Sequence, residues 1–264
     1  MLQSKICNAC GTQYPSHETL AICPVCSDDR QAVPLETGQI WTTHDRLLKT
    51  HSVQILALQE HVYQLEVIPK FAIGQRAFFI LTDQGNILWD CIPLLDEATV
   101  AFIRAKGGLD AIAISHPHYY SNVKNWAQTF DCPVYIHEKD KQWIREEEER
   151  IHLWKTNQKS LWNGMQLINI GGHFPGSSIL RVPFLSPKGT IFCSDTLFIA
   201  PSMKHISLIY SAPNRIPLPR AEVKRIKKRL DDIEFDTLYG FWKYQHLTKN
   251  VKDLLKVSFN RYLQ

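Results

Sequence analysis

Four cysteines near the N-terminus have the spacing of a metal site. They form two CxxC pairs, Cys7 with Cys10 and Cys23 with Cys26, and 12 residues separate the pairs. The 7 cysteines of this 264-residue chain would produce about 0.2 such pairs by chance, so two pairs are well above random expectation. Two thiolates three positions apart on a tight turn can bind one ion, and two such turns complete a tetrahedron. The pattern predicts a closed, structural Zn²⁺ site, which folds a segment too short to hold a core of its own.

A pair of histidines follows an apolar segment in the middle of the chain. His116 and His118 flank Pro117, directly after the apolar residues 111–115. Pro117 disfavours helix at His116 and favours an extended backbone, in which residues two apart face the same side. Both imidazoles are then able to reach one ion. With 11 histidines in the chain, about 0.5 such pairs arise by chance, so this signal is weak when taken alone.

Two later segments strengthen the signal. The sequence GGHFPGSS, residues 171–178, places His173 in a turn of glycine and proline, and CSDTLF, residues 193–198, places Asp195 after an apolar strand. In this order, the HxH, H-x-P-G-x-S and D-T-L-F segments resemble those of the metallo-β-lactamase superfamily, over roughly residues 60–245. The resemblance implies an α/β fold, a four-layer αββα sandwich with a metal at one edge. It also implies that His116, His118 and His173 form the first metal site, with Asp195 at or next to it.

The first motif departs from the family pattern H-x-H-x-D-H. Tyr120 and Ser121 stand where the family has an aspartate and a histidine of a second metal site. The family's late histidine is also missing after the last core strand, and the nearest histidine, His246, comes several residues later. A tyrosine phenol is a poor zinc ligand at neutral pH, because its pKa is about 10. The departures predict a core site with one ion, Zn²⁺ or Fe²⁺.

Without that aspartate, other groups must handle the proton of the attacking water. Asp195 can act as a base, or it can coordinate the ion and fill the open position. Tyr119 and Tyr120 can donate hydrogen bonds to a substrate oxyanion, or pack under the loop as aromatic side chains. Asp195 and Tyr120 are therefore the candidate catalytic residues.

Apolar runs and turn residues predict the elements that position these side chains. Strands are expected over residues 61–67, 77–81, 86–91, 111–115, 133–137, 165–170, 178–182, 190–193 and 237–241. Helices are expected over residues 96–105, 122–129, 139–150, 219–231 and 248–262, with residues 31–50 as a linker that leads into a short helix. Strands that alternate with helices are typical of α/β proteins, whose sites lie at strand ends.

The segment that contains the two CxxC pairs is predicted to be a zinc ribbon, a small domain folded around one ion, and to occupy residues 1–35. The metallo-β-lactamase-like domain is predicted to occupy residues 36–264. The two CxxC turns of the ribbon also resemble those of rubredoxin, which leaves iron as the alternative to zinc there. A redox dithiol is disfavoured, because two pairs are present and no βαβ segment surrounds either.

The composition predicts a cytoplasmic globular protein, and the candidate metal site adds a small-molecule substrate as the expected partner. Hydrophobic residues make up 44% and charged residues 21% of the chain, as in ordinary soluble domains. No apolar run reaches the roughly 18 residues that span a bilayer, which predicts no membrane partner. An odd number of cysteines, four of them in tight pairs, fits a reducing compartment. The basic run at residues 220–229 has no interleaved aromatic residues, so it does not favour nucleic acid. The oligomeric state stays open.

Three functions are compatible with these residues. The leading hypothesis is a metal-dependent hydrolase of a small ester- or thioester-type substrate that uses water bound to a single zinc ion. The second is a mononuclear non-haem iron dioxygenase of the persulfide dioxygenase type, because His116, His173 and Asp195 match its facial triad. The third is a non-catalytic binding protein, with the ribbon as an interaction module and an eroded metal site.

Overall fold

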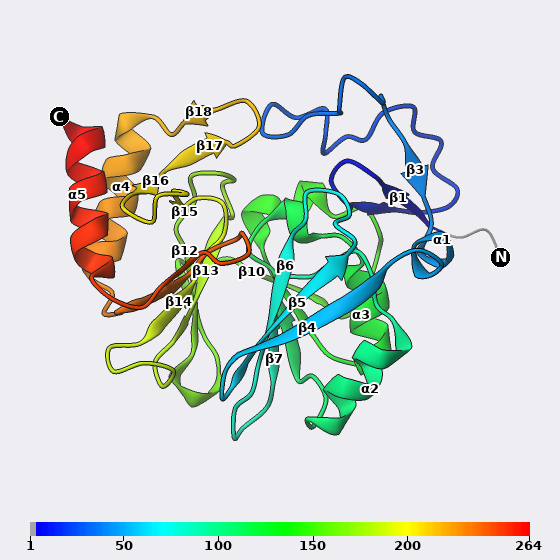
Figure 1. Cartoon of the computed structure of the whole chain (residues 1–264), viewed down its shortest axis with the longest axis horizontal. Helices are drawn as coiled ribbons and strands as arrows, with labels where there is room; N and C mark the ends of the chain where they lie inside the picture. Colours follow the sequence, from blue (N-terminus) through cyan, green and yellow to red (C-terminus); the bar gives the residue numbers. More distant parts are fainter. Residues whose placement is uncertain (1–3) are drawn as a thin grey trace.

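Two β-sheets lie side by side at the centre of the molecule (Figure 1). The computed structural model describes residues 4–264. The first sheet has seven strands in the order β10-β9-β8-β7-β6-β5-β4, with β4 (Ser52–Gln59), β5 (Val62–Ile68), β6 (Arg76–Ile80), β7 (Ile87–Trp89), β8 (Ala111–Ala113), β9 (Val134–His137) and β10 (Ile151–Trp154). The second sheet has six strands in the order β11-β12-β13-β14-β19-β20, with β11 (Gln158–Ser160), β12 (Gln166–Asn169), β13 (Ser178–Val182), β14 (Thr190–Phe192), β19 (Thr237–Tyr239) and β20 (His246–Leu247).

Apolar side chains from both sheets share one buried core. Phe78 of β6 and Phe192 of β14 meet edge to face, with ring centroids 4.9 Å apart. Trp89 of β7 and Leu180 of β13 are buried in the same cluster. Because side chains alternate across a strand, the opposite face of each sheet is left to pack against helices.

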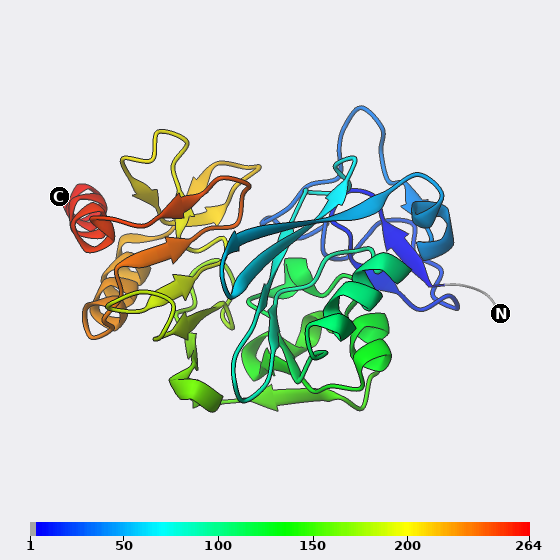
Figure 2. The same ribbon diagram turned by 60° about the horizontal axis from the view of Figure 1, so that its bottom comes forward.

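Helices cover the two outer faces and complete four layers. The first sheet is covered by α2 (Glu97–Ala105) and α3 (Val123–Phe130), and the second by α4 (Arg220–Asp231) and α5 (Val251–Leu263) (Figures 1 and 2). The Asp96 carboxylate caps α2 by accepting a hydrogen bond from the Thr99 amide, 2.8 Å away. The predicted α/β sandwich is confirmed. No helix within residues 4–264 is long and apolar enough to cross a membrane.

A small three-stranded sheet carries the N-terminal cysteines. It consists of β1 (Lys5–Cys7), β2 (Gln13–Tyr14) and β3 (Trp41–Thr42), and the short helix α1 (His44–Leu48) follows it. Strand β3 lies beyond residue 35, yet it pairs with β1. The boundary between residues 1–35 and 36–264 stays a prediction. Two short hairpins, β15 (Phe198–Ile199) with β16 (Ile206–Ser207) and β17 (Ile209–Ser211) with β18 (Ile216–Pro217), lie between β14 and α4.

The predicted helix over residues 139–150 is wrong. Only a 3₁₀ helix, Glu138–Trp143, forms there, and the chain then turns into β10. The Glu148 side chain instead accepts bonds from the Arg150 backbone and side chain, directly before the parallel pairing of β10 with β9.

Candidate metal centre

The four predicted donor side chains come from the ends of both sheets. His116 and His118 follow β8 of the first sheet, whereas His173 follows β12 and Asp195 follows β14 of the second. The expected extended backbone is found at His116, with φ −168° and ψ 172°, but not at His118. Pro117 begins a 3₁₀ turn instead, because its fixed φ and missing N–H suit the first position of a helix. The two rings still converge, with centroids 5.0 Å apart.

The distances between the donor atoms fit a single ion. Asp195 Oδ2 lies 3.6 Å from His116 Nε2, 3.6 Å from His118 Nδ1 and 3.5 Å from His173 Nε2. His118 Nδ1 and His173 Nε2 are 3.2 Å apart. A tetrahedral ion with ligand bonds of about 2.0–2.1 Å would place its donors about 3.3–3.4 Å from one another. The four side chains can therefore hold a divalent metal ion between the two sheets.

The protonation states also suit metal binding. Burial lowers the pKa of His116 to about 4 and that of His173 well below its ordinary value, so both imidazoles are neutral at pH 7. Burial acts to raise the pKa of Asp195, but its contacts with His116 and His118 outweigh burial and hold that pKa well below the usual range. Neutral imidazoles and an ionised carboxylate are the forms that coordinate metals.

A buried carboxyl group, that of Asp90, orients His116 through a serine. Ser115 Oγ lies 2.8 Å from His116 Nδ1 and donates to Asp90 Oδ2 over 3.0 Å, and the Ser115 amide donates to Asp90 Oδ1 over 2.7 Å. Because the Ser115 hydroxyl donates its hydrogen bond to Asp90, Ser115 Oγ can accept a hydrogen bond from the Nδ1–H group of His116. His116 Nε2 then carries no proton and is free to bind an ion. Sequence reasoning missed Asp90, although it directly follows the apolar β7 and Asp195 likewise lies shortly after β14. Asp90 also has a left-handed φ of 67°, which is uncommon for a residue with a side chain.

His173 has its own support in the second half of the chain. Its Nδ1 donates to the backbone oxygen of Tyr210 over 2.6 Å, which directs Nε2 toward the other donors. The ring of Phe174, the next residue, is fully buried and lies 4.9 Å from His173, 5.1 Å from His118 and 5.8 Å from His116. Phe174 is therefore an apolar platform under the three imidazoles, and sequence reasoning had assigned it no role.

The residues at the second-site positions do not join the donor group. Ser121 accepts a hydrogen bond from Gln75 Nε2, 3.0 Å away, and Tyr120 is buried in the core of the first sheet. Tyr119 packs in the same core and contacts Phe241, with ring centroids 5.6 Å apart. The catalytic role of Tyr120 stays a prediction, and its burial in this core gives that role no support. His246, on β20, packs against Tyr239 and is not among the clustered donors of residues 4–264.

A pocket of about 500 Å³ opens onto His118 and Asp195. Its lining is largely apolar and includes the aromatic side chains of Phe241 and Trp242. The segment after the second CxxC pair also contributes to the wall. This part of the lining is Arg30, Gln31, Ala32 and Pro34.

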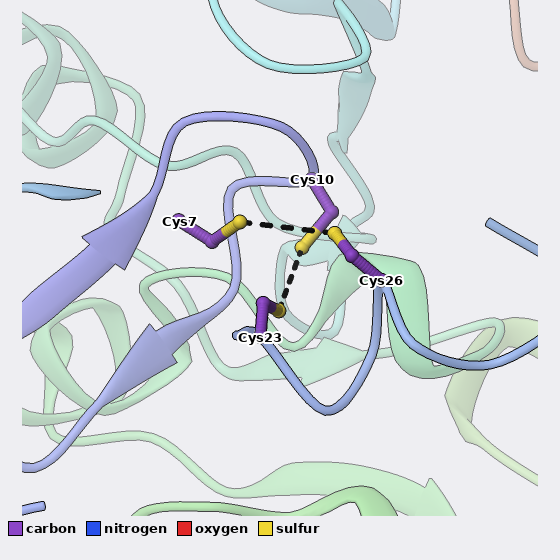
Figure 3. Close-up of side chains that lie close together, drawn as sticks. All are labelled: Cys7, Cys10, Cys23 and Cys26. Carbon is purple, nitrogen blue, oxygen red and sulfur yellow. Dashed lines mark hydrogen bonds between the residues drawn. The ribbon is translucent and has the colours of Figure 1, made fainter. Parts of the chain in front are cut away.

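The four ribbon cysteines form a second, closed cluster. Their side chains converge on a common centre (Figure 3), and all four are buried. The Sγ atoms of Cys7 and Cys26 lie 3.7 Å apart, as do those of Cys10 and Cys23. These distances are too long for a disulfide and match the edge of about 3.8 Å in a tetrahedron with metal–sulfur bonds of about 2.3 Å. The cluster therefore has the donor set of a structural metal site.

Comparisons with known proteins agree with this architecture. No family model matches the chain. The chain is 35% identical to YmaE of Bacillus subtilis (strain 168), described as an uncharacterized protein, over 263 residues that cover 98% of this chain and 95% of YmaE. The metallo-β-lactamase DIM-1 superposes with a TM-score of 0.58 at 13% identity and covers 80% of this chain and 97% of its own. The metallo-β-lactamase FIM-1 from Pseudomonas aeruginosa, in its mono-zinc form, gives a TM-score of 0.57 at 12% identity over 79% of this chain and 95% of its own. The resemblance predicted from the motifs is confirmed at the level of fold.

Proposed function

The chain belongs to the same family as YmaE and has the metallo-β-lactamase fold, and from this premise we propose that it is a hydrolase of small ester- or thioester-type substrates that uses one metal ion. The observation that carries the proposal is the convergence of His116, His118, His173 and Asp195 within 4.8 Å of one another, next to an open pocket. The paired cysteines support a reducing compartment such as the cytoplasm.

The donor residues have distinct roles in this proposal. A zinc ion held by such ligands lowers the pKa of a coordinated water to about 7 and polarises a carbonyl oxygen. The three histidines bind the ion, and Ser115 and the Tyr210 carbonyl fix two of their rings. Asp195 and His118 also line the pocket, so an entering substrate would meet these two donors first. The nearly equal distances of Asp195 to the three histidines favour a role as the fourth ligand over a role as a separate base, so a coordinated water would be a fifth ligand of the ion.

The surroundings support one ion rather than two. The hydroxyl of Ser121 is already hydrogen-bonded to Gln75, and burial raises the pKa of Tyr120 well above its ordinary value, so neither offers an anionic ligand. FIM-1, which has the same fold, has been crystallised in a mono-zinc form. One zinc ion is thus compatible with this architecture.

The pocket favours an acyl group that has an apolar body and an anionic end. Phe198, Phe241 and Trp242 provide apolar surface beside the donor group. Lys70 also lines the pocket, with its ammonium 5.7 Å from the centroid of the Trp242 ring, and no carboxylate among residues 4–264 forms an ion pair with it. An unpaired cation at a pocket wall is suited to a carboxylate or a similar anion on the substrate.

The geometry favours a hydrolase over the dioxygenase. A facial triad would need only His116, His173 and Asp195, but His118 Nδ1 lies within 3.6 Å of the Asp195 oxygen and completes a set of four donors. Three imidazoles with a carboxylate suit zinc, whereas two histidines with a carboxylate suit iron and oxygen chemistry.

The test combines metal analysis with a panel of neutral and anionic acyl esters, thioesters and lactones. We expect hydrolysis that is lost on chelation and falls by at least about 100-fold in His116→Ala, because removal of a ligand leaves the water without its activating ion. His152→Ala, which removes an exposed histidine of β10, is the matched control and should retain full activity. Metal content measured beside Cys7→Ser separates the core ion from the ribbon ion. Wild-type protein that carries a core zinc ion yet hydrolyses none of the panel would refute the proposal, and iron with oxygen uptake would favour the dioxygenase.

A further inference from the structure

The segment that follows the second CxxC pair is hydrogen-bonded to β17 and to the turn after it. Tyr210 Oη donates to Asp29 Oδ1 over 2.6 Å, and Asn214 Nδ2 donates to the Asp29 backbone oxygen over 2.9 Å. Ser211 Oγ donates to the backbone oxygen of Arg30 over 3.2 Å. Residues more than 180 positions apart in the sequence are therefore joined by three hydrogen bonds, where the blue and yellow ribbons meet in Figure 1.

Arg30 lies between two aromatic rings at this contact. Its guanidinium carbon is 4.4 Å from the centroid of Phe174 and 4.7 Å from that of Tyr210. Asp28 holds the guanidinium from the side, because Nη1 donates to both carboxylate oxygens over 2.7 and 2.8 Å. Only 15% of the Arg30 side chain is exposed, so the stacking is largely screened from water.

Both rings that Arg30 contacts belong to residues that support the histidines. Phe174 lies under His116, His118 and His173, and the Tyr210 carbonyl accepts the Nδ1 proton of His173. Arg30 itself is not among the clustered donors. The ring contacts that connect Arg30 to the histidines therefore run through these two residues.

The ribbon fixes where Arg30 lies. Arg30 follows Cys26 by only four residues, and the intervening turn is tied back by hydrogen bonds from the Ser27 amide to the Cys23 oxygen and from the Arg30 amide to Asp28 Oδ1, both 3.0 Å long. An ion bound by the four cysteines would hold this turn in place, because the second CxxC pair provides two of its ligands.

We propose that Arg30 is a positioning residue of the core metal site, and that the four-cysteine ribbon controls the affinity of that site for its ion by fixing Arg30. The ribbon is then a functional part of the metal centre as well as a folding device. The inference rests on the proposed function in one respect only, namely that His116, His118, His173 and Asp195 bind an ion.

The first experiment measures the affinity of the core site for zinc by competition with a chromophoric chelator in the full-length protein. Arg30→Ala should weaken core binding by about tenfold, since loss of outer contacts of metal ligands costs about 10- to 100-fold and Arg30 acts one contact further out. Arg30→Lys should not restore it, because an ammonium cannot stack between two rings and pair with Asp28 in the same way. Glu36→Ala, an exposed carboxylate of the same N-terminal segment, is the control and should bind as wild type does.

The second experiment tests the link to the ribbon. Cys23→Ser should lower core affinity by a similar factor, and Arg30→Ala in the Cys23→Ser background should add little, because both changes act through the same turn. If Cys23→Ser does not fold cooperatively, Gln39→Ala replaces it, since Gln39 accepts from the Cys23 amide and donates to Cys7 Sγ, and its loss perturbs the ribbon while all four cysteines remain.

The outcomes separate this proposal from the proposed function. Arg30→Ala protein with a full ribbon and unchanged core affinity would overturn the role of Arg30. Additive effects of Arg30→Ala and the ribbon change would overturn the link between them. Wild-type protein without any core zinc would instead refute the proposed metal centre.

Discussion

Replacement of Ser115 by alanine should weaken binding of the core ion by about 10- to 100-fold. Ser115 Oγ connects Asp90 to His116, because it lies 3.0 Å from Asp90 Oδ2 and 2.8 Å from His116 Nδ1. Within residues 4–264, no other side-chain atom makes this connection. Alanine removes both contacts without adding volume. The His116 ring is then free to adopt the tautomer that carries its proton on Nε2, which cannot bind an ion.

The magnitude follows from these two contacts. A buried hydrogen bond contributes about 0.5–1.5 kcal/mol, so the loss of both contacts costs about 1–3 kcal/mol. Asp90 keeps its bond from the Ser115 amide in the variant, so its carboxyl group is not left without a partner. A loss of about 1.4–2.7 kcal/mol in binding free energy corresponds to the 10- to 100-fold change in affinity.

The assay is a zinc titration of metal-free protein against a chromophoric chelator, with a fit of separate core and ribbon sites. Ser258→Ala is the matched control, because Ser258 Oγ is also buried, accepts from the Ile206 amide and donates to Leu254, but lies on α5. It should lower the stability of the protein and leave core affinity unchanged. A Ser115→Ala protein whose core affinity stays within about twofold of wild type would refute the relay through Ser115.

Three further predictions concern the pocket and the core. Lys70→Gln should raise KM for an ester with a terminal carboxylate by about fivefold and leave KM for its neutral analogue unchanged, as steady-state kinetics would show. Arg76→Met should lower the free energy of unfolding by about 3 kcal/mol in urea titrations, because the buried Arg76 guanidinium donates to the backbone oxygens of Gly240 and Gln245. Asp140→Asn should be more stable than wild type at pH 8, by roughly 1–3 kcal/mol. Burial raises the pKa of Asp140 to about 7 from 3.8, so wild-type stability falls as the pH rises from about 4 through 7, whereas the asparagine variant should lack this slope.

Each of these predictions has an outcome that would contradict it. Equal increases in KM for the anionic and neutral esters would show that Lys70 affects the shape of the pocket and does not bind the anionic group of the substrate. Lys204→Gln, at an exposed lysine, is the control for Lys70→Gln. Unchanged urea midpoints in Arg76→Met would mean that water satisfies the exposed carbonyls. Parallel stability curves for Asp140→Asn and wild type between pH 4 and 8 would show that Asp140 ionises normally.

The donor residues could be predicted from the sequence because each lies in a short local signature. His116 and His118 are two residues apart, and His173 and Asp195 each lie within three residues of the end of an apolar segment. Their order along the chain was enough to imply the fold and the cluster. The local backbone conformation could not be predicted equally well. The sequence favours an extended backbone at these histidines, but Pro117 begins a 3₁₀ turn, and the imidazoles converge through that turn.

The charged residues between β9 and β10 show the opposite case. Residues 139–150 contain many helix formers, and propensity alone favours a helix there. The bonds from Arg150 to Glu148 and Asp131, together with the pairing of β10 on β9, stabilise an irregular segment instead. Tertiary contacts of this kind override a weak local preference and leave no signal in the segment itself.

The support of the metal centre was not accessible from the sequence, because its contacts join distant segments. Arg30 and Tyr210 are separated by 180 positions, and neither lies in a recognisable motif. The sequence suggested that the ribbon only folds its own segment, yet Arg30 packs on the platform below the three histidines. Because the same segment also lines the pocket, a change in the ribbon would reach both the ion and the substrate. Ion affinity and KM should therefore be measured in the same ribbon variants. Ion affinity reports on the metal centre, whereas KM responds both to the metal centre and to the wall of the pocket, so the two measurements together separate the effects.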